Sequence, residues 1–581
     1  MDRIKGSFVK SSRNMFEFLK NSENIKEAFL KSINYENQFN LVPFSRFMLE
    51  DEELIKKLLE WRIKNKYFFF DEMEPTYETT LNWLNSEIIS NPDRILFLIF
   101  NKNGKIYGCV GLNIKEFFEN SIELDHLVIL PEANYSEANK IIKTLVEWCK
   151  KIINVEKFYW RVFSNKKNRI QMFKKIGFEE IQMLDYSKNI NLNISQYTSY
   201  NSSRSKVLLF EYKNKLLDDK KQILTAGPSI SQKEIFYVNN AVTTGWNKNH
   251  SRYLDLFQKK FSEILQVKYC IATSSCTGAL IISLMALDIG EGDEVIIPDI
   301  SWVAAGRAVQ TVGAKPVFVD ILNSDWTMDT SKIENLINKN TRAIMPVHLY
   351  GMPCDMSEIM RLAKKHNLKI IEDAAPAIGA THKNKFCGSF GEFGAFSFQG
   401  AKLTVTGEGG MLVTNDLNLY EKAIKIWDFG RDIKRTFWID QVGTKFKMSN
   451  IQAALGLGQI ERLDEMIYMK RRIFKWYEEY LDHQKVNLIK ENSSNFSIYW
   501  MSNITIESNK ISRDNLILEL KKKNIDSRPV FPSVSEYPIW ESNQDLDISK
   551  IVARKGLNLP SGVSLEKNDI QRVCKEINRL I

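Results

Sequence analysis

One lysine and one aspartate are the residues of this chain whose surroundings point most directly to chemistry. Lys402 is the only basic residue in the run 397–410, and it lies between a strand-like segment and a cluster of glycines. A lysine held at such a turn and shielded from water can have its ammonium pKa lowered enough to act as a nucleophile. The alternative is a surface lysine beside a turn. Asp373 ends a short apolar run that begins at Leu368. Ligands collect at the carboxyl ends of parallel strands, so this aspartate is placed to meet one.

The elements that must position these two residues alternate between strand-like and helical segments. Such alternation predicts an α/β fold with a mostly parallel sheet and helices on both of its faces. Long helical stretches from Asn450 and from Asp464 then lead into a smaller α/β part. The strand-like segments are residues 268–273, 294–298, 316–320, 343–349, 368–373, 395–399 and 411–414.

From about residue 226 to 581, the order and wording of these segments resemble the DegT-type aminotransferases of the perosamine-synthase branch. Members of that family have the fold-type-I aminotransferase architecture, use pyridoxal phosphate and act on sugar nucleotides. The resemblance implies that Lys402 bonds covalently to the cofactor. It also implies that Asp373 faces the pyridine nitrogen and keeps it protonated, so that the ring serves as an electron sink. Relatives with histidine in place of this lysine are dehydratases, so Lys402 favours amino transfer.

A phosphate site is predicted where a strand gives way to a helix. Ser275, Cys276 and Thr277 offer free N–H groups and hydroxyls there, which suit a phosphate dianion. Serine and threonine also cap helices without any ligand, so this signal is weak by itself. The resemblance adds Ser397, which matches a hydroxyl that binds the same phosphate in relatives.

Two further cofactor-binding candidates come from the resemblance. Trp302 matches the aromatic residue that stacks on the pyridine ring, although a tryptophan at a strand end more often belongs to a core. Lys445 lies in a segment that relatives lend across a dimer interface to the cofactor phosphate of the neighbouring subunit. We therefore expect a homodimer. His348 is interpreted as structural.

The N-terminal part has a different order of elements. Helical patterns are followed by a β-hairpin with Asn103-Gly104 at its turn, a strand at 122–130 and a helix at 136–152. The order, together with the ending 168–178, is similar to that of GNAT-type N-acetyltransferases over residues 40–213. Further predicted elements are the helices 54–64, 78–90 and 168–175, the hairpin strands 95–100 and 106–112, and the strands 158–163 and 207–212.

The acetyltransferase resemblance implies acetyl-CoA as a co-substrate, but two features depart from the family. The stretch 131–138 contains no glycine, whereas a glycine-rich loop lets backbone N–H groups approach a pyrophosphate closely. Phe173 replaces the tyrosine that commonly protonates the departing thiolate. Glu123 and Asp125 are candidate bases, or equally solvated strand residues, and Asn168 is a further candidate. The domain is thus either an acetyltransferase or a non-catalytic module that binds a nucleotide or a partner.

Composition excludes several classes of protein. The net charge of +9 arises from 80 basic and 71 acidic residues spread along the whole chain, so no nucleic-acid-binding patch is expected. A mild positive field still favours anionic ligands such as nucleotide diphosphates. The seven cysteines have no regular spacing, which argues for reduced thiols in the cytoplasm and against a disulfide frame or a metal site. No apolar run reaches membrane-spanning length.

The sequence therefore predicts an aminotransferase fused to a GNAT-like domain. Glutamate would donate the amino group to a GDP-, dTDP- or UDP-linked 4-keto-6-deoxy sugar, and the N-terminal domain would acetylate the new amine for surface glycan synthesis. An aminotransferase of cyclitols or antibiotic sugars is an alternative, because fold does not fix the substrate. The expected parts are a helical N-terminal extension (1–39), the GNAT-like domain (40–213), a linker (214–225), the large aminotransferase domain (226–484) and the small one (485–581).

Overall fold

The computed structural model divides the chain into two compact units. The first comprises residues 1–218 and 230–236, and the second comprises residues 219–229 and 237–581. The structure describes residues 7–35, 38–64, 75–114, 121–129, 135–153, 155, 157–163, 170–171, 174–175, 178–185, 206–212, 222–432, 434–507, 510–540 and 546–581.

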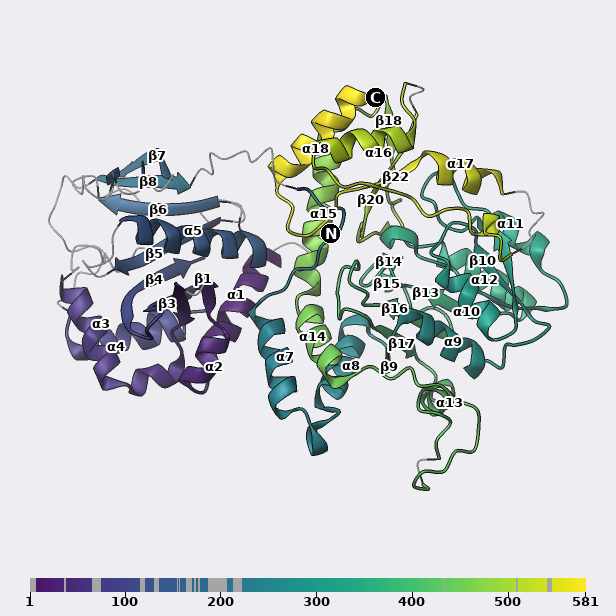
Figure 1. Ribbon diagram of the computed structural model, residues 1–581, viewed down its shortest axis with the longest axis horizontal. Helices are drawn as coiled ribbons and strands as arrows, with labels where there is room; N and C mark the ends of the chain where they lie inside the picture. Colours follow the sequence, from purple (N-terminus) through teal and green to yellow (C-terminus); the bar gives the residue numbers. More distant parts are fainter. Residues whose placement is uncertain are drawn as a thin grey trace. The chain divides into compact units, whose positions relative to one another are not determined.

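The first unit is built on an eight-stranded sheet with the order β1-β2-β3-β4-β5-β6-β8-β7 (Figure 1). Neighbouring strands are antiparallel except for β5 and β6, which are parallel. The predicted hairpin is confirmed as β3 and β4, with Gly104 in the left-handed region at φ 75°. The strands are β1 (Ile33–Tyr35), β2 (Phe39–Pro43), β3 (Arg94–Asn101), β4 (Ile106–Asn113), β5 (Ser121–Ile129), β6 (Lys157–Phe163), β7 (Phe178–Asp185) and β8 (Lys206–Tyr212).

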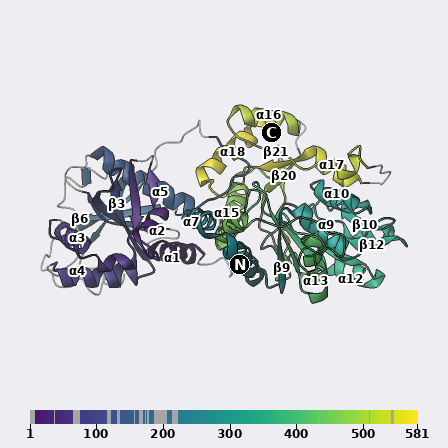
Figure 2. The same cartoon turned by 60° about the horizontal axis from the view of Figure 1, so that its bottom comes forward.

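Helices cover both faces of this sheet because β3 is apolar on both. Ile95, Phe97 and Ile99 pack in one core cluster with α1 (Ser7–Lys20) and α5 (Tyr135–Ile152). Leu96, Leu98 and Phe100 pack in another with α2 (Ile25–Leu30) and α3 (Glu52–Lys64). Figure 2 shows α5 and α3 on opposite sides of β3.

The N-terminal extension is more than the polar helical segment that the sequence predicts. Helices α1 and α2 are confirmed, but β1 adds a strand to the edge of the sheet. Met15, Phe16 and Leu19 of α1 are buried in the same cluster as the sheet. Their spacing gives α1 an apolar stripe, so it packs instead of remaining solvated.

Lys20, the last residue of α1, holds the end of a neighbouring helix. Helix α4 (Tyr77–Trp83) continues as a π-helical segment (Leu84–Ile89), as expected for one helix over 78–90. Lys20 Nζ donates to the backbone carbonyls of Ile88, Ile89, Asn91 and Arg94 at 2.7–3.2 Å. A helix leaves its last carbonyls without partners, and the buried ammonium satisfies them. Burial lowers the pKa of Lys20 to about 8.

The second unit contains a seven-stranded sheet with the order β11-β10-β12-β13-β16-β17-β9. All neighbouring pairs are parallel except those of β17, which runs antiparallel to β16 and to β9. The predicted mostly parallel sheet is confirmed. Its strands are β9 (Tyr269–Thr273), β10 (Glu294–Pro298), β11 (Lys315–Val319), β12 (Thr341–Ile344), β13 (Lys369–Asp373), β16 (Phe393–Ser397) and β17 (Gly410–Thr414).

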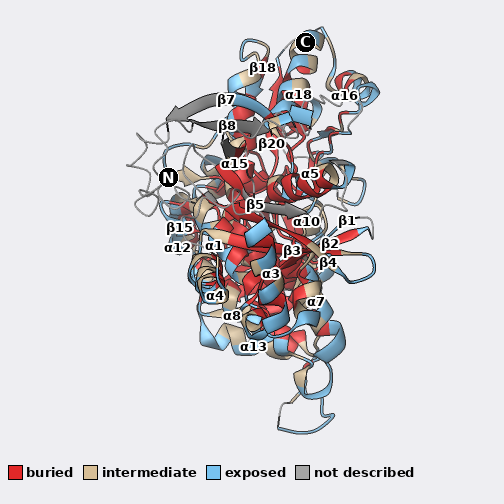
Figure 3. Ribbon diagram, turned by 90° about the vertical axis from the view of Figure 1, so that its left-hand side faces the viewer, coloured by how far each residue is buried: buried red, intermediate tan, exposed pale blue. Residues whose placement is uncertain are grey.

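Helices lie on both sides of this sheet, with α9 and α10 on one side and α8, α12 and α14 on the other (Figure 1). Helix α9 is apolar around its circumference and buried, as expected for a helix in the middle of a large domain. Figure 3 shows the buried residues concentrated in the strands and in the sheet-facing sides of the helices. The helices between residues 232 and 480 are α7 (Gln232–Thr244), α8 (Arg252–Leu265), α9 (Cys276–Ala286), α10 (Ala304–Thr311), α11 (Thr330–Ile333), α12 (Met356–His366), α13 (Leu417–Trp427), α14 (Asn450–Ile460) and α15 (Leu463–Tyr480).

The C-terminal part of the second unit forms an antiparallel sheet with the order β18-β20-β22-β21. Two buried carboxylates tie it to the large sheet, Asp299 after β10 and Asp320 after β11. Asp299 accepts from the Ser533 hydroxyl and the Ser535 amide, and Asp320 accepts from the Ser549 amide and hydroxyl. Its elements are β18 (Val486–Leu488), β20 (Ser502–Ile506), α16 (Arg513–Lys522), β21 (Arg528–Pro529), α17 (Asp547–Lys555), β22 (Gly556–Leu559) and α18 (Lys567–Leu580), and Asn495–Phe496 (β19) joins Thr381–His382 (β14) and Lys385–Phe386 (β15) in a small three-stranded sheet.

The described end of the predicted linker is ordered by pairing. Ile223 is fully buried, and its amide donates to the carbonyl of Asn524 at 2.9 Å. The Asp526 amide donates back to the Ile223 carbonyl at 2.8 Å. Residues 213–221 of the same stretch lie outside the described part of the chain. Among the described helices, none is long and apolar enough to cross a bilayer.

Candidate active site

The carboxyl ends of four parallel strands gather the candidate residues at one edge of the large sheet. Strands β9, β10, β13 and β16 point the same way, so the residues that follow them lie on the same side. Those residues are Ser274 to Thr277 after β9, Asp299 to Trp302 after β10, Asp373 at the end of β13, and Ser397 with Lys402 at and beyond the end of β16.

Lys402 lies in the connection between β16 and β17. Its amide donates to the Gln399 carbonyl at 2.8 Å, which closes a tight turn, and its Nζ lies 3.9 Å from the ring centroid of Trp500. Burial lowers the pKa of the Lys402 ammonium, and the negative charge of Asp373 opposes that shift. A lysine with a lowered pKa beside a carboxylate can act as a nucleophile and then carry a proton.

Asp373 is a buried carboxylate with spare acceptor capacity. Its Oδ1 accepts the Ala375 amide at 3.0 Å, the only hydrogen bond to this carboxylate from the described residues. Burial raises the pKa of Asp373, and the Ala375 amide and the Lys402 ammonium oppose that shift. A buried carboxylate of this kind gains from a protonated ring nitrogen as its partner, since each charge relieves the desolvation cost of the other.

The N-terminus of α9 lies beside these two residues and presents backbone amides to them. Ser275 caps the helix by accepting the Gly278 amide at 3.0 Å. The amides of Cys276 and Thr277 have no acceptor among the described residues, so they and the helix dipole are available to a phosphate. Cys276 itself is a buried thiol, and burial raises its pKa well above the usual range.

Gly410 allows β17 to pass close to this helix terminus. It pairs with Thr273 in the β17–β9 ladder, and a Cβ at Gly410 would lie 2.5 Å from the carbonyl carbon of Ser275. Ser397, opposite Gly410 in the β16–β17 ladder, is also buried and accepts the Gln399 amide at 3.4 Å. Only glycine fits between the two backbones here.

The residues at this edge fit pyridoxal phosphate. A lysine with a lowered pKa, a buried carboxylate and an anion-binding helix terminus come from separate strands and meet at one place, and Lys402, Asp373 and Cys276 are close enough to shift one another's pKa values. The lysine suits the cofactor's carbonyl, the carboxylate its pyridine nitrogen and the helix terminus its phosphate.

Trp302 and Lys445 are more exposed to solvent than Lys402 and Asp373. Trp302 is 58% exposed, and its ring centroid lies 5.6 Å from that of Phe531. Lys445 lies in the segment after α13, where its Nζ is 3.5 Å from Asp428 Oδ1 and 5.2 Å from the ring centroid of Phe429. Within one chain, Lys445 is thus paired with Asp428.

Three aromatic residues that the sequence did not single out join the site. The ring of Tyr350 stacks on Trp500 with centroids 5.9 Å apart and on Phe531 with centroids 5.2 Å apart. The Tyr350 hydroxyl accepts the Phe531 amide at 3.0 Å. These residues come from three distant segments, and no local pattern marks them.

A buried pair formed by His348 and Glu372 holds β13 in place. His348 Nδ1 accepts the Cys354 amide at 3.1 Å, so the ring proton is on Nε2, which donates to Glu372 at 3.1 Å. Glu372 also accepts the amides of Gly388, Phe390 and Gly391. All these contacts are internal, in agreement with the structural role expected for His348.

In the first unit, β5 and β6 part after a short paired stretch. Within their described residues they pair only from Ser121 to Glu123, whereas β5 continues to Ile129 beside β4 and β6 continues to Phe163 beside β8. The parting leaves two backbone edges facing each other, to which an extended ligand can bond like an added strand. Glu123 lies where the strands part and is 3% exposed, so it is not the solvated strand residue of the alternative interpretation.

The other acetyltransferase candidates are described only in part. The backbone of Asp125 pairs with Gly111 in β4, but its side chain lies outside the described residues. Asn168, Phe173 and residues 131–134 of the glycine-free stretch also lie outside them. Of the candidates in this unit, Glu123 is therefore the one whose burial is known.

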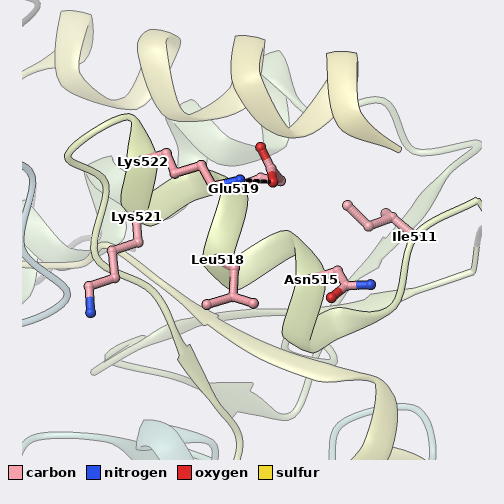
Figure 4. A pocket seen from close by; sticks show the side chains of 6 residues that line it. All are labelled: Ile511, Asn515, Leu518, Glu519, Lys521 and Lys522. Carbon is pink, nitrogen blue, oxygen red and sulfur yellow. Dashed lines mark hydrogen bonds and ion pairs between the residues drawn. The ribbon is translucent and has the colours of Figure 1, made fainter.

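A surface pocket lies away from all of these residues, on α16 (Figure 4). Within it, Lys522 Nζ donates to Glu519 Oε1 at 2.6 Å, and Leu518 is exposed. No candidate residue of either unit lines it. The lining residues are Ile511, Asn515, Leu518, Glu519, Lys521 and Lys522.

Comparisons with known families cover both units. Residues 228–578 match the DegT/DnrJ/EryC1/StrS aminotransferase family, and residues 49–192 match the acetyltransferase (GNAT) domain. The chain is 41% identical over 352 residues to GDP-perosamine synthase of Escherichia coli O157:H7, which covers 60% of this chain and 96% of that protein. It is 38% identical over 370 residues to GDP-perosamine synthase of Caulobacter vibrioides, which covers 63% and 100%.

Solved structures agree with these matches. The crystal structure of DesI in the presence of its TDP-sugar product aligns with a TM-score of 0.58 and 27% identity, covering 62% of this chain and 93% of that one. The aminotransferase TlmJ from Streptoalloteichus hindustanus aligns with a TM-score of 0.59 and 25% identity, covering 61% and 98%. The chain therefore belongs to the DegT/DnrJ/EryC1/StrS aminotransferase family and carries a GNAT acetyltransferase domain ahead of its aminotransferase part.

Proposed function

We propose that the second unit transfers an amino group from glutamate to the keto carbon of a 4-keto-6-deoxy sugar nucleotide. Glutamate becomes a keto acid, and the sugar becomes a 4-amino sugar. The observation that carries this proposal is the meeting of Lys402, Asp373 and the N-terminus of α9 at one sheet edge. The sugar nucleotide and its 4-keto group rest on the two GDP-perosamine synthases, which are similar over nearly their whole length.

Each residue at the edge has a distinct task. Pyridoxal phosphate, when bound, supplies an electron sink beside the carbon that gains or loses a proton. Asp373 holds a proton on the pyridine nitrogen, and the amides of Cys276 and Thr277 bind the phosphate with the hydroxyl of Ser397. Lys402 Nζ holds the cofactor and carries the proton to and from the reacting carbon of donor and acceptor.

The experiment that tests this proposal compares Lys402→Ala with Lys422→Ala, a surface lysine that pairs with Asp288. Both proteins are incubated with glutamate and a panel of GDP-, dTDP- and UDP-linked keto sugars, and the products are identified by mass spectrometry. We expect one keto sugar to gain an amine with the Lys422 variant and none to do so with the Lys402 variant. Amination by Lys402→Ala would refute the assignment.

We propose further that the first unit acetylates the new 4-amino group with acetyl-CoA. The parted strands β5 and β6 support this, because an extended pantetheine chain can bond to the freed edges. Glu123, buried where the strands part, is placed to take the proton that the amine loses. The product would be a 4-acetamido-4,6-dideoxy sugar nucleotide for a surface glycan.

A non-catalytic module is the second candidate for the first unit, favoured by the absence of glycine from residues 131–138. Incubation of the 4-amino sugar nucleotide with acetyl-CoA, followed by assay of free thiol, separates the two. We expect thiol release by the native protein and its loss in Glu123→Gln. No thiol release and no acetyl-CoA binding by calorimetry would make this unit a recognition module.

We also propose that two copies of the chain form a homodimer through the second unit. In the segment between α13 and α14, Phe437 is 88% and Val442 is 82% exposed, and this segment extends away from the sheet (Figure 1). Large exposed apolar side chains mark an interaction surface. The same segment carries Lys445, which would then be available to the cofactor phosphate of the partner subunit.

A further inference from the structure

The ammonium group of Lys402 contacts an aromatic side chain that has no role in the proposed reaction. Lys402 Nζ lies over the indole ring of Trp500, 3.9 Å from its centroid. The negative π face of an indole attracts a cation, and the attraction grows when water is excluded. Trp500 is 5% exposed, so the contact is shielded from solvent.

Hydrogen bonds hold both the side chain and the backbone of Trp500. Its indole Nε1 donates to the Ala401 carbonyl at 2.9 Å, so the same side chain holds the backbone just before Lys402. Its carbonyl accepts Lys470 Nζ at 2.6 Å, and its ring stacks on Tyr350. A ring restrained in this way presents its face at one place, which is what a positioning group requires.

The charges around Lys402 do not make this contact redundant. Asp373 on β13 and Cys276 on α9 are the titratable groups that act on the ammonium besides the indole. In the proposed function, Asp373 is engaged with the pyridine nitrogen when the cofactor is bound. Lys470 is a second cation near Trp500, but it is directed to the carbonyls of Trp500 and Ser561. The indole face is therefore the contact that remains free for Lys402.

We propose that Trp500 is a positioning residue that holds the free Lys402 side chain against its indole face while the lysine is not bonded to the cofactor. The proposal deepens the proposed aminotransferase function and rests on it for its role in turnover. A lysine side chain has many rotamers, and confinement of its tip keeps Nζ near the reacting carbon between the two halves of the reaction.

The test measures the protonation of Lys402 itself, without any sugar or donor. Full-length protein freed of cofactor is treated with cyanate across a pH series, and carbamylation of the Lys402 peptide is measured by mass spectrometry. Only the neutral amine reacts, so the midpoint reports the pKa of Lys402. We expect Trp500→Met to lower the midpoint by about one pH unit, because a π face stabilises the ammonium and a thioether does not.

Conservative and control variants make the result specific. Trp500→Phe keeps a weaker π face, so it should lower the midpoint by less than Trp500→Met, and it serves alone if the latter does not fold. Trp326→Phe alters another indole that contacts Tyr350, and it should leave the midpoint unchanged. A rise of the midpoint in Trp500→Met would mean that the indole only excluded water, which overturns the proposal. An unchanged midpoint, or an equal shift in Trp326→Phe, overturns it as well. Because the assay needs no turnover, a wrong substrate assignment leaves its outcome unaffected.

Discussion

Replacement of Gly410 by alanine should weaken cofactor binding more than it weakens the fold. The added Cβ would lie 2.5 Å from the carbonyl carbon of Ser275 and 2.6 Å from the amide nitrogen of Cys276, and both are backbone atoms. Strand β17 and the N-terminus of α9 must therefore separate by roughly 0.9 Å to restore ordinary contact. That displacement falls on the amides proposed to bind the cofactor phosphate.

The expected magnitude follows from hydrogen-bond lengths. Charge-assisted N–H to phosphate bonds are about 2.7–2.9 Å long, and a stretch of this size takes them beyond hydrogen-bonding distance. Each such bond contributes about 1.5–3 kcal/mol, so the loss of the Cys276 and Thr277 bonds costs about 3–6 kcal/mol. We expect the dissociation constant for pyridoxal phosphate to rise about 10²- to 10⁴-fold. Overpacking alone should lower the unfolding free energy by about 1–3 kcal/mol.

The assay is a fluorescence titration of the cofactor-free protein with pyridoxal phosphate, accompanied by urea melts without cofactor. Gly400→Ala is the matched control in the same connection, because its Cβ would meet only the Gly407 carbonyl oxygen, at 3.8 Å. If Gly410→Ala binds the cofactor as tightly as Gly400→Ala, the phosphate does not lie at the N-terminus of α9.

Three further predictions address other parts of the second unit. Asp373→Asn should retain the cofactor but lose most of its amination rate, because a neutral amide does not hold the pyridine nitrogen protonated; an unchanged rate in single-turnover assays would place the essential carboxylate elsewhere. Burial lowers the pKa of Lys470 to about 7, whereas an unfolded lysine titrates near ~10.4. Between these pH values the unfolded state binds more protons than the native state. The stability of the native protein relative to Lys470→Met should therefore rise with pH, by up to about 1.4 kcal/mol per pH unit. Urea melts of both proteins at several pH values in that window check this, and a constant difference in stability would contradict it. Phe437→Asp combined with Val442→Asp should sediment as a monomer, whereas the exposed control Leu518→Asp should remain a dimer.

The sequence was sufficient for the parts of the site that follow from strand direction. Once a parallel sheet is expected, a carboxylate that ends a strand must lie at the common edge, which is how Asp373 was predicted. Ser275 was predicted from the step between a strand and a helix, and Ser397 came from the family resemblance. The hairpin in the first unit was predictable for a similar reason, because its turn residues are adjacent in the chain.

The residues that the sequence did not reveal depend on packing between distant segments. Trp500, Tyr350 and Phe531 meet only after the C-terminal part folds against the large sheet, and no periodicity records that contact. Lys20 and Lys470 appear in sequence as ordinary helical lysines, whose common place is the solvent. Each becomes buried because neighbouring backbone carbonyls supply acceptors, which the sequence does not display.

The position of β17 has a consequence for how the protein is made. Strand β9 leaves the ribosome early, but its partner in the ladder is β17, which pairs Gly410 with Thr273. At ~5–20 residues per second, the delay between the two is on the order of ten seconds, during which the edge of β9 and the N-terminus of α9 lack their neighbour. Trp500 is synthesised later still, and the bridge from Ile223 to Ile525 closes near the end of the chain. A chain released before β17 is made therefore presents the N-terminus of α9 without the strand that passes close beside it in the folded protein.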